Sequence, residues 1–391
     1  TMFHNCLYLQ SGGPSAVINS TFQGLRDAYQ KNREGKLFVS PYGISGLLNE
    51  ELLDKSDDTE DYSFLPGAHF GSLRKMLPEE VDAPIGKEII EKLKKYEISH
   101  LFLNGGNDSM DTAYKIQRYF DYYGYQGTVL GLPKTIDNDL FGTDHTPGYG
   151  TAAKFVANAT LAIYDDEYTY RKGKIILIET MGRDSGYVAA SAKLCALRGK
   201  DPDYIYVPEV PFDISSFLDK AIKTYQEKGH CIIVLSEGIR NQEGKLISDS
   251  QKDDAFGNRI GGGVSNYLTS LLLEKGYPAR NIIFNTLNRS SSFLPSLTDI
   301  NEARMVGSFA YEKALEGKSD FMVSIQRKES QKYEIELSLF PLAKCRKEAS
   351  SFPASYIAKS NDQIDDSFLS YVLPLIQGNA LPLEDDGLLP K

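Results

Sequence analysis

The sequence predicts an α/β protein with two domains, each built on a parallel β-sheet covered by helices. With 391 residues, the chain exceeds the size that a single hydrophobic core usually supports. Several short segments are apolar at every position, which is typical of parallel strands buried on both faces. Each of these segments leads into a glycine-rich or polar turn and then into a helical pattern. This repeated order indicates right-handed βαβ units.

Three such units are expected in the first domain. Their predicted strands are Cys6–Leu9, Leu101–Leu103 and Thr128–Leu132. The first strand leads through a glycine turn into a helix that ends at about Tyr29, and the second leads into a helix that ends at about Phe120.

A second α/β domain is expected to begin near Tyr149. Its predicted strands are Ile175–Ile178, Cys231–Leu235 and Ile282–Phe284. The later segment Ser330–Ser360 reads as polar and irregular, and it suggests no role.

The composition excludes several classes of function. The net charge of −10 argues against nucleic acid as the main partner. No apolar run approaches the length of a membrane span, and no signal-peptide pattern opens the chain, so a cytoplasmic protein without membrane contact is expected. The cysteines form no CxxC pair and the histidines no HExxH motif, which makes a zinc site or a disulfide framework improbable.

Two glycine turns follow predicted strands and are candidate anion cradles. Gly12 and Gly13 open what is predicted as a helix directly after the first strand, and Gly106-Asn107-Asp108-Ser109 does the same after the second. Exposed amides at a helix start favour phosphate, although a tight turn without ligand has the same sequence. Two cradles at one sheet edge favour a polyphosphate. Asp108 would repel an additional phosphate, but it could equally be a first-turn helix acid.

The segment Pro133–Asp139, with sequence PKTIDND, is the most informative stretch of the chain. It follows an apolar strand, so its charges lie at the carboxyl edge of a sheet, where open α/β folds bind ligands. Lys134 can hold phosphate charge and Asp137 can accept a proton from a hydroxyl, while Asp139 orients the site or binds metal-bound water. The alternative is an Asx-rich turn that satisfies only its own backbone.

Further charges stand near strand ends in the second half of the chain. Arg183 could grip phosphate oxygens, Arg280 and Arg289 flank the sixth strand, and Glu237 could accept hydrogen bonds from sugar hydroxyls. A glycine-punctuated loop that ends in Arg74 and Lys75 could cover a phosphate donor. Each of these residues alone is more often an ordinary surface charge.

Together, the motifs resemble the phosphofructokinase family. In chain order they are SGGPSAVIN (11–19), GSLRK (71–75), GGNDS (105–109), PKTIDND (133–139), MGRDSGY (181–187), SEG (236–238) and NRSSS (288–292). The resemblance fades after about Gly317. It implies two Rossmann-like domains: a phosphoryl-donor domain of residues 1–148 with about 288–391, and a sugar-phosphate domain of about 149–287.

The resemblance also implies a phosphoryl donor. ATP-using members of the family typically carry glycine at the positions of Asp108 and Lys134, whereas pyrophosphate-using members carry aspartate and lysine, as here. Asp108 would obstruct the α-phosphate and nucleoside of ATP, and Lys134 would add charge for compact pyrophosphate. The implied reaction is the reversible, Mg²⁺-dependent phosphorylation of fructose 6-phosphate by pyrophosphate.

The family pattern assigns a role to each matching residue. Asp137 would be the base and would also contact Mg²⁺ with Asn107, and the substrates would be held at a subunit interface of a homodimer or homotetramer. The implied sugar contacts are Thr135, Asp139, Lys174, Met181, Gly182, Arg183, Glu237, Arg280, Thr286 and Arg289. Lys174 stands where some members have an arginine that reaches across the interface.

Two departures from the family pattern keep alternatives open. Asn107 replaces an aspartate that many members associate with Mg²⁺, and Thr286 replaces a histidine or tyrosine near the 6-phosphate. The smaller threonine could admit a longer sugar such as sedoheptulose 7-phosphate. An ATP-dependent kinase on the same scaffold and a non-catalytic sugar-phosphate-binding subunit are the remaining alternatives.

Overall fold

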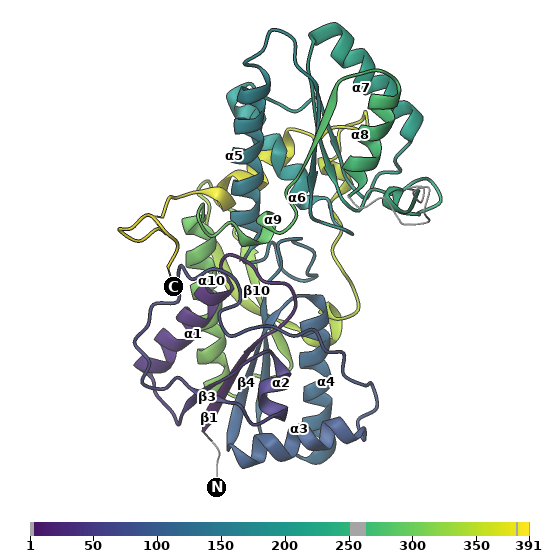
Figure 1. Cartoon of the computed structure of the whole chain (residues 1–391). Coiled ribbons are helices and arrows are strands. Elements are labelled where there is room, and N and C mark those ends of the chain that lie inside the picture. Colours follow the sequence, from purple (N-terminus) through teal and green to yellow (C-terminus); the bar gives the residue numbers. More distant parts are fainter. Residues whose placement is uncertain (1–3, 251–262, 381, 391) are drawn as a thin grey trace.

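The computed structural model describes residues 4–250, 263–380 and 382–390. The described chain forms two lobes, each with a β-sheet between helices, and the C-terminal segment runs beside their junction (Figure 1). The predicted α/β class with two parallel-type sheets is therefore confirmed.

The first lobe contains a seven-stranded sheet with the strand order β11-β10-β5-β4-β1-β2-β3. β10 and β11 pair antiparallel, as do β2 and β3, and the remaining neighbours are parallel. Its strands are β1 (Asn5–Gln10), β2 (Leu37–Ser40), β3 (Leu53–Asp54), β4 (Ile98–Gly105), β5 (Thr128–Pro133), β10 (Phe321–Arg327) and β11 (Ile335–Pro341). Its helices are α1 (Ile18–Lys31), α2 (Ile44–Leu48), α3 (Pro84–Lys95), α4 (Asn107–Tyr123), α10 (Leu297–Leu315) and α11 (Leu342–Cys345).

The second lobe contains a four-stranded, fully parallel sheet with the order β7-β8-β6-β9. Its strands are β6 (Ile175–Thr180), β7 (Tyr204–Tyr206), β8 (Cys231–Ser236) and β9 (Ala279–Ile283). Around it lie the helices α5 (Tyr149–Glu167), α6 (Tyr187–Ala190), α7 (Ile214–Lys228), α8 (Val264–Glu274), α9 (Leu287–Ser290) and α12 (Ser367–Val372). Four short 3₁₀ helices complete the described elements: η1 (Ser191–Arg198), η2 (Ile247–Ser250), η3 (Ala354–Tyr356) and η4 (Leu373–Ile376).

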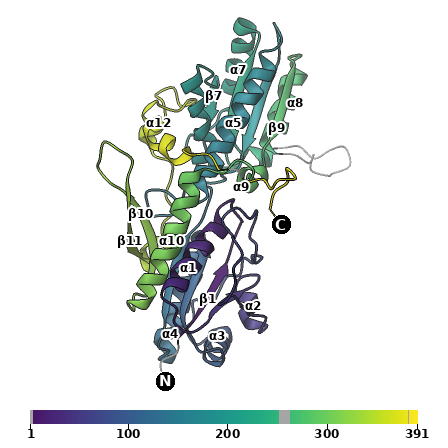
Figure 2. The same cartoon turned by 90° about the vertical axis from the view of Figure 1, so that its left-hand side faces the viewer.

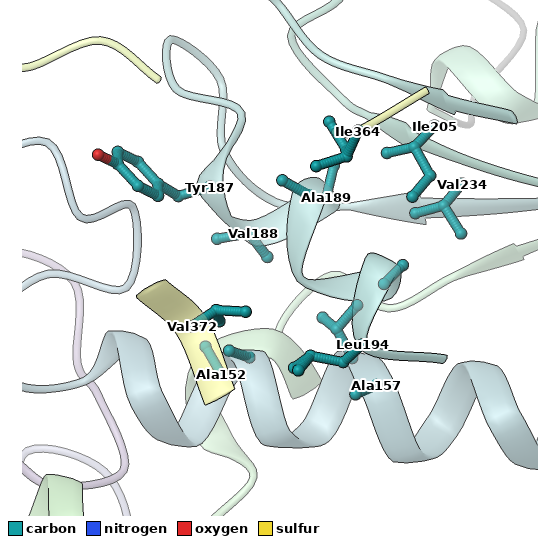
Figure 3. Packing of buried hydrophobic residues seen from close by; sticks show 14 of the residues in the cluster. Ala152, Ala157, Tyr187, Val188, Ala189, Leu194, Ile205, Val234, Ile364 and Val372 are labelled. Carbon is teal, nitrogen blue, oxygen red and sulfur yellow. The ribbon is translucent and has the colours of Figure 1, made fainter. Parts of the chain in front are cut away.

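The C-terminal segment contributes to the core of the second lobe. Ile364, Phe368 and Val372 are buried among residues of α5, α6 and β8, and Figure 3 shows Ile364 and Val372 in this cluster. Helix α12 lies close to the hairpin of β10 and β11 (Figure 2), and the guanidinium of Arg327 in β10 donates to the carbonyl of Tyr371 in α12 at 3.0 Å. Residues 354–376, placed above with the first domain, thus pack largely against the second lobe.

Two local expectations need correction. Gly12 and Gly13 do not open a helix, because α1 begins only at Ile18 and Gly12 has a positive φ of 78°. The segment Ser330–Ser360 is not irregular throughout, because it supplies strand β11 and helix α11. In β11, half-buried positions alternate with exposed ones at first, as on an edge strand, so it lacks the fully apolar signal of the central strands.

Strand register explains why distant motifs meet. Gln10 of β1 pairs with Asn104 of β4, and Gly105 of β4 pairs with Pro133 of β5. The loops that follow these strands therefore leave the sheet side by side, at the edge facing the second lobe (Figure 1).

Candidate active site

A cavity of about 340 Å³ lies where these loops meet the second lobe. Many of the residues singled out from the sequence line this cavity, since the loops after β1, β4 and β5 all contribute and Arg289 reaches it from α9. The lining residues are Gly12, Gly13, Pro14, Arg74, Gly106, Asn107, Asp108, Ser109, Lys134, Thr135, Ile136, Asp137, Asp139, Met181, Asp184 and Arg289.

The glycine loops pack tightly against one another. A Cβ on Gly105 would lie 2.0 Å from Ser109 Oγ and 2.8 Å from the carbonyl of Ser11, so this position has room only for glycine. The Ser11 amide donates to the Asn104 carbonyl at 2.9 Å, which joins the loop after β1 to β4. Gly106 then caps α4, whose seventeen residues point their amino end at the cavity. This amino end favours an anion.

Lys134 is the buried cation of the cavity, with 4% of its surface exposed. Its ammonium donates to the Gly13 carbonyl and would lie 3.5 Å from a Cβ on Gly12. Burial lowers the pKa of Lys134 to about 8, with the positive charge of Arg289 acting in the same direction and Asp137 opposing it. A bound anion would offset that burial and keep the lysine charged.

Two carboxylates face the same cavity and repel each other. Burial, helped by the charge of Glu237, raises the pKa of Asp137 to about 6. Burial and the charge of Asp137 raise the pKa of Asp139 to about 7, and the amide of Asn107 donates to Asp139 at 3.0 Å. Carboxyl groups poised this close to neutrality are suited to exchanging a proton with a substrate.

Asp108 and Arg74 form an ion pair at the mouth of the cavity. Arg74 Nε lies 3.4 Å from Asp108 Oδ2, and both side chains are more than half exposed. Both residues also line the cavity, so the pair lies between its interior and solvent. Lys75, the next residue, is exposed and does not line the cavity.

A second, smaller cavity adjoins the first at the carboxyl ends of β6, β8 and β9. Met181 lines both cavities, and Glu237 lines the second. The backbone of Met181 donates to the buried side chain of Asn288 at 2.8 Å, which ties this turn to α9. Burial and the charge of Glu179 raise the pKa of Glu237.

Other predicted contacts lie outside both cavities within this chain. Gly182 is buried behind the turn, whereas Arg183 and Thr286 are exposed next to the lining residues Met181, Asp184 and Asn285. Lys174 and Arg280 lie at the opposite, amino-terminal end of the second sheet: Lys174 immediately precedes β6, and Arg280 pairs with Ile176 near the start of that strand.

Two acidic residues near the cavities were not singled out from the sequence. Asp184 lines the first cavity and pairs with Arg240 at 2.5 Å. Glu179 lines the second cavity, and its carboxylate accepts from the amide of Ser265 at 2.8 Å, in the first turn of α8. A charged residue inside the otherwise apolar strand Ile175–Thr180 was the signal that could have marked Glu179.

The donor atoms in the first cavity suit Mg²⁺ that arrives with a phosphate. Asp137, Asp139 and the amide oxygen of Asn107 are hard oxygen ligands at one place. Among the described residues no cluster of three or more His, Cys, Asp or Glu side chains could hold a metal alone. Mg²⁺ commonly binds through one or two carboxylates together with substrate phosphate and water, so this set fits.

Glycine loops, a buried lysine and poised carboxylates at the facing edges of two α/β lobes define a phosphotransferase. A phosphofructokinase family model matches residues 5–314. The chain is 36% identical over 402 residues to the pyrophosphate–fructose 6-phosphate 1-phosphotransferase of Xanthomonas campestris pv. campestris, covering 99% of this chain and 95% of the relative. It is 34% identical over 399 residues to the enzyme of that name from Halomonas elongata, with the same coverage.

The fold agrees with that of a solved relative. The crystal structure of the pyrophosphate-dependent phosphofructokinase from Marinobacter aquaeolei superposes with a TM-score of 0.88 at 32% identity, covering 99% of this chain and 95% of that one. The chain belongs to the phosphofructokinase family. No helix among the described residues is long and apolar enough to cross a membrane.

Proposed function

We propose that the protein catalyses reversible phosphoryl transfer from pyrophosphate to the 1-hydroxyl of fructose 6-phosphate. The observation that carries this proposal is the placement of Lys134, Asp108 and Asp137 around one cavity. A lysine at the position of Lys134 and an aspartate at the position of Asp108 characterise the pyrophosphate-using members of the family that the chain resembles. The full-length relatives named above carry the same activity in their names.

In the forward direction, Asp137 accepts the proton of the sugar 1-hydroxyl. Its pKa of about 6 leaves it mostly ionised at neutral pH yet basic enough to take the proton. The hydroxyl oxygen then bonds to the near phosphorus of pyrophosphate as the bridging P–O bond breaks, and orthophosphate leaves. Lys134, Arg289 and the amides around Gly106 stabilise the charge of the group in transfer.

Mg²⁺ belongs to the proposal as well. Asp137, Asp139 and the oxygen of Asn107 would hold it beside the pyrophosphate, where it would supply charge neutralisation for the transferring phosphoryl group.

The second cavity would take the sugar. Glu237 would accept hydrogen bonds from sugar hydroxyls, and the turn of Met181 and Arg183 would border the ring. Thr286 lies exposed at the start of α9 and is smaller than the histidine or tyrosine expected there. Longer sugar phosphates such as sedoheptulose 7-phosphate are therefore a second acceptor class to test.

The position of Lys174 and Arg280 supports a homo-oligomer. If these cations bind the sugar phosphate, they cannot do so in their own chain, because they lie at the opposite end of the second sheet from its cavities. The exposed apolar side chain of Leu273, in the last turn of α8, lies near this amino-terminal end of the sheet, because β9 begins shortly after α8 ends. A second copy docked there would receive both cations in its own sugar site.

A coupled assay tests the reaction. Purified protein with fructose 6-phosphate and Mg²⁺ is given pyrophosphate or ATP at equal concentration, and the formation of fructose 1,6-bisphosphate is measured. For the reverse direction, the consumption of fructose 1,6-bisphosphate with orthophosphate is measured. Turnover with pyrophosphate, reversible with orthophosphate, is expected. Turnover with ATP alone would overturn the donor assignment, and saturable binding without turnover would support a regulatory subunit.

A complementation experiment tests the shared site. Asp137→Asn and Arg280→Ala chains are each expected to be inactive alone. If Arg280 serves its neighbour, a mixed dimer contains one site with both residues intact, and an equal mixture regains about a quarter of wild-type activity. If Arg280 acts within its own chain, no site in the mixture is intact and no activity returns.

A further inference from the structure

The catalytic loop holds one residue in an unusual conformation between its two acids. Asn138 has a positive φ of 56° and is 4% exposed, whereas its neighbours Asp137 and Asp139 line the cavity. Asparagine tolerates this left-handed conformation better than most residues, but the conformation persists only where surrounding groups fix it. The partners of the Asn138 side chain therefore determine how the two acids are presented.

The Asn138 amide is bonded at both of its polar atoms. Its oxygen accepts from the backbone amide of Thr146 at 2.9 Å, and its nitrogen donates to the hydroxyl of Tyr371 at 2.7 Å. The Tyr371 hydroxyl in turn donates to the carbonyl of Asp144 at 2.7 Å. This hydroxyl thus closes a chain of bonds between α12 and both ends of the 138–146 loop.

Tyr371 is itself held firmly. It is 8% exposed, and its ring packs 5.8 Å from the rings of Tyr187 and Tyr356. The guanidinium carbon of Arg327 lies 4.7 Å from the ring centroid, and the same group donates to the Tyr371 carbonyl. A side chain that is packed on several sides can restrain a loop to which it is hydrogen-bonded.

We propose that Tyr371 is a positioning residue, which holds Asp137 and Asp139 in their working orientation through Asn138. The proposal rests on the proposed phosphoryl transfer and gives the C-terminal segment a role in it. Tyr371 lines neither of the two cavities, so its loss acts on the geometry of the acids and spares the glycine loops that would bind the donor. A displacement of about an ångström at a reacting group can cost up to roughly a hundredfold in rate.

The test compares Tyr371→Phe with Tyr356→Phe. Both variants lose one hydroxyl from the same aromatic cluster, but among the described hydrogen bonds only the Tyr371 hydroxyl reaches the loop. Tyr371→Phe is expected to lower kcat about tenfold and to change KM for either substrate by less than about twofold. Tyr356→Phe is expected to keep the wild-type kcat.

Two further readouts separate positioning from a general loss of structure. Asn138→Ala combined with Tyr371→Phe should lower kcat little more than Asn138→Ala alone, because both changes break the same bond between Asn138 and Tyr371. Hydrogen exchange of the peptide containing Thr146 should accelerate in Tyr371→Phe and not in Tyr356→Phe. Wild-type kcat in Tyr371→Phe, or additive losses in the double variant, would overturn the proposal.

The exchange measurement also distinguishes the two proposals. If the wild-type protein does not use pyrophosphate, the proposed function fails, yet faster exchange in Tyr371→Phe alone still supports the restraint of the loop. Unchanged exchange in Tyr371→Phe contradicts the restraint whatever the reaction is.

Discussion

Replacing Lys134 by methionine should lower the catalytic rate and, at the same time, raise the stability of the unliganded protein. The substitution keeps the approximate length of the side chain and removes the buried positive charge that lines the first cavity. Loss of one preorganised cationic donor to the transferring group should lower kcat with pyrophosphate by about a hundred- to a thousandfold. Initial rates at saturating fructose 6-phosphate measure this loss.

The unliganded protein should become more stable. Burial lowers the pKa of Lys134 from 10.5 to about 8, so the charged lysine costs the folded state roughly 3 kcal/mol at neutral pH. Its bond to the Gly13 carbonyl returns about 1 kcal/mol. Lys134→Met should therefore raise the free energy of unfolding by about 2 kcal/mol in urea titrations.

The pH dependence of this gain has a definite sign. The folded wild type releases the Lys134 proton near pH 8 and the unfolded chain near pH 10.5. Between these values the unfolded state binds more protons, so wild-type stability rises with pH. The advantage of the variant should be constant below pH 8 and shrink above it.

Lys154→Met is the matched control. Lys154 is also a buried lysine, but it donates to the carbonyls of Pro295 and Gly378 at 2.9 Å, away from the cavity. Its loss should lower stability by about 1–3 kcal/mol and leave kcat unchanged. A Lys134→Met protein with kcat within threefold of wild type, or with lower stability at pH 7, would refute the reasoning.

Three further outcomes are expected. His145 is buried between Asp144 and Glu302, and these two acids raise its pKa to about 9 despite burial. The stability that it contributes is therefore fully present below about pH 6.5 and is lost as the pH rises through 9. The free energies of unfolding of wild type and His145→Gln, measured in urea titrations, should converge by roughly 2–3 kcal/mol over that range. Gly105→Ala should lower the affinity for pyrophosphate in calorimetry, because the new methyl would meet Ser109 Oγ. Removal of Mg²⁺ with a chelator should abolish turnover, and restoring Mg²⁺, but not K⁺, should recover it.

The loops that line the first cavity were predictable because the signals that place them are local. Fully apolar runs mark parallel strands, and parallel strands align their carboxyl ends, so the segments around Gly12, Gly106 and Lys134 had to meet. The same logic placed Glu237 and Met181 at the edge of the second sheet. The start of α1 was missed, because the positive φ of Gly12 and the loop that follows it leave no trace in hydrophobic periodicity.

The location of Arg280 shows where local signals stop. The expected strand Ile282–Phe284 leaves Arg280 just ahead of it, but β9 begins at Ala279 and includes that arginine at its amino end. The side of the sheet on which a charge lies depends on strand register, and register is fixed by pairing with β6, a segment about a hundred residues earlier. The resemblance to the family could identify Arg280 as a sugar contact. It could not show that Arg280 and the second cavity of the same chain lie at opposite ends of the sheet.

The link between Asn138 and Tyr371 lies still further beyond sequence reasoning, since it joins residues 233 positions apart. An asparagine between two aspartates indicates a turn, and a turn could have satisfied its own backbone. The structure instead bonds this side chain to the C-terminal segment. Two mutually repelling acids buried in one cavity would tend to separate or turn toward water. A restraint on the far side of the loop, outside the cavity, can hold both in place without occupying space that the substrates need.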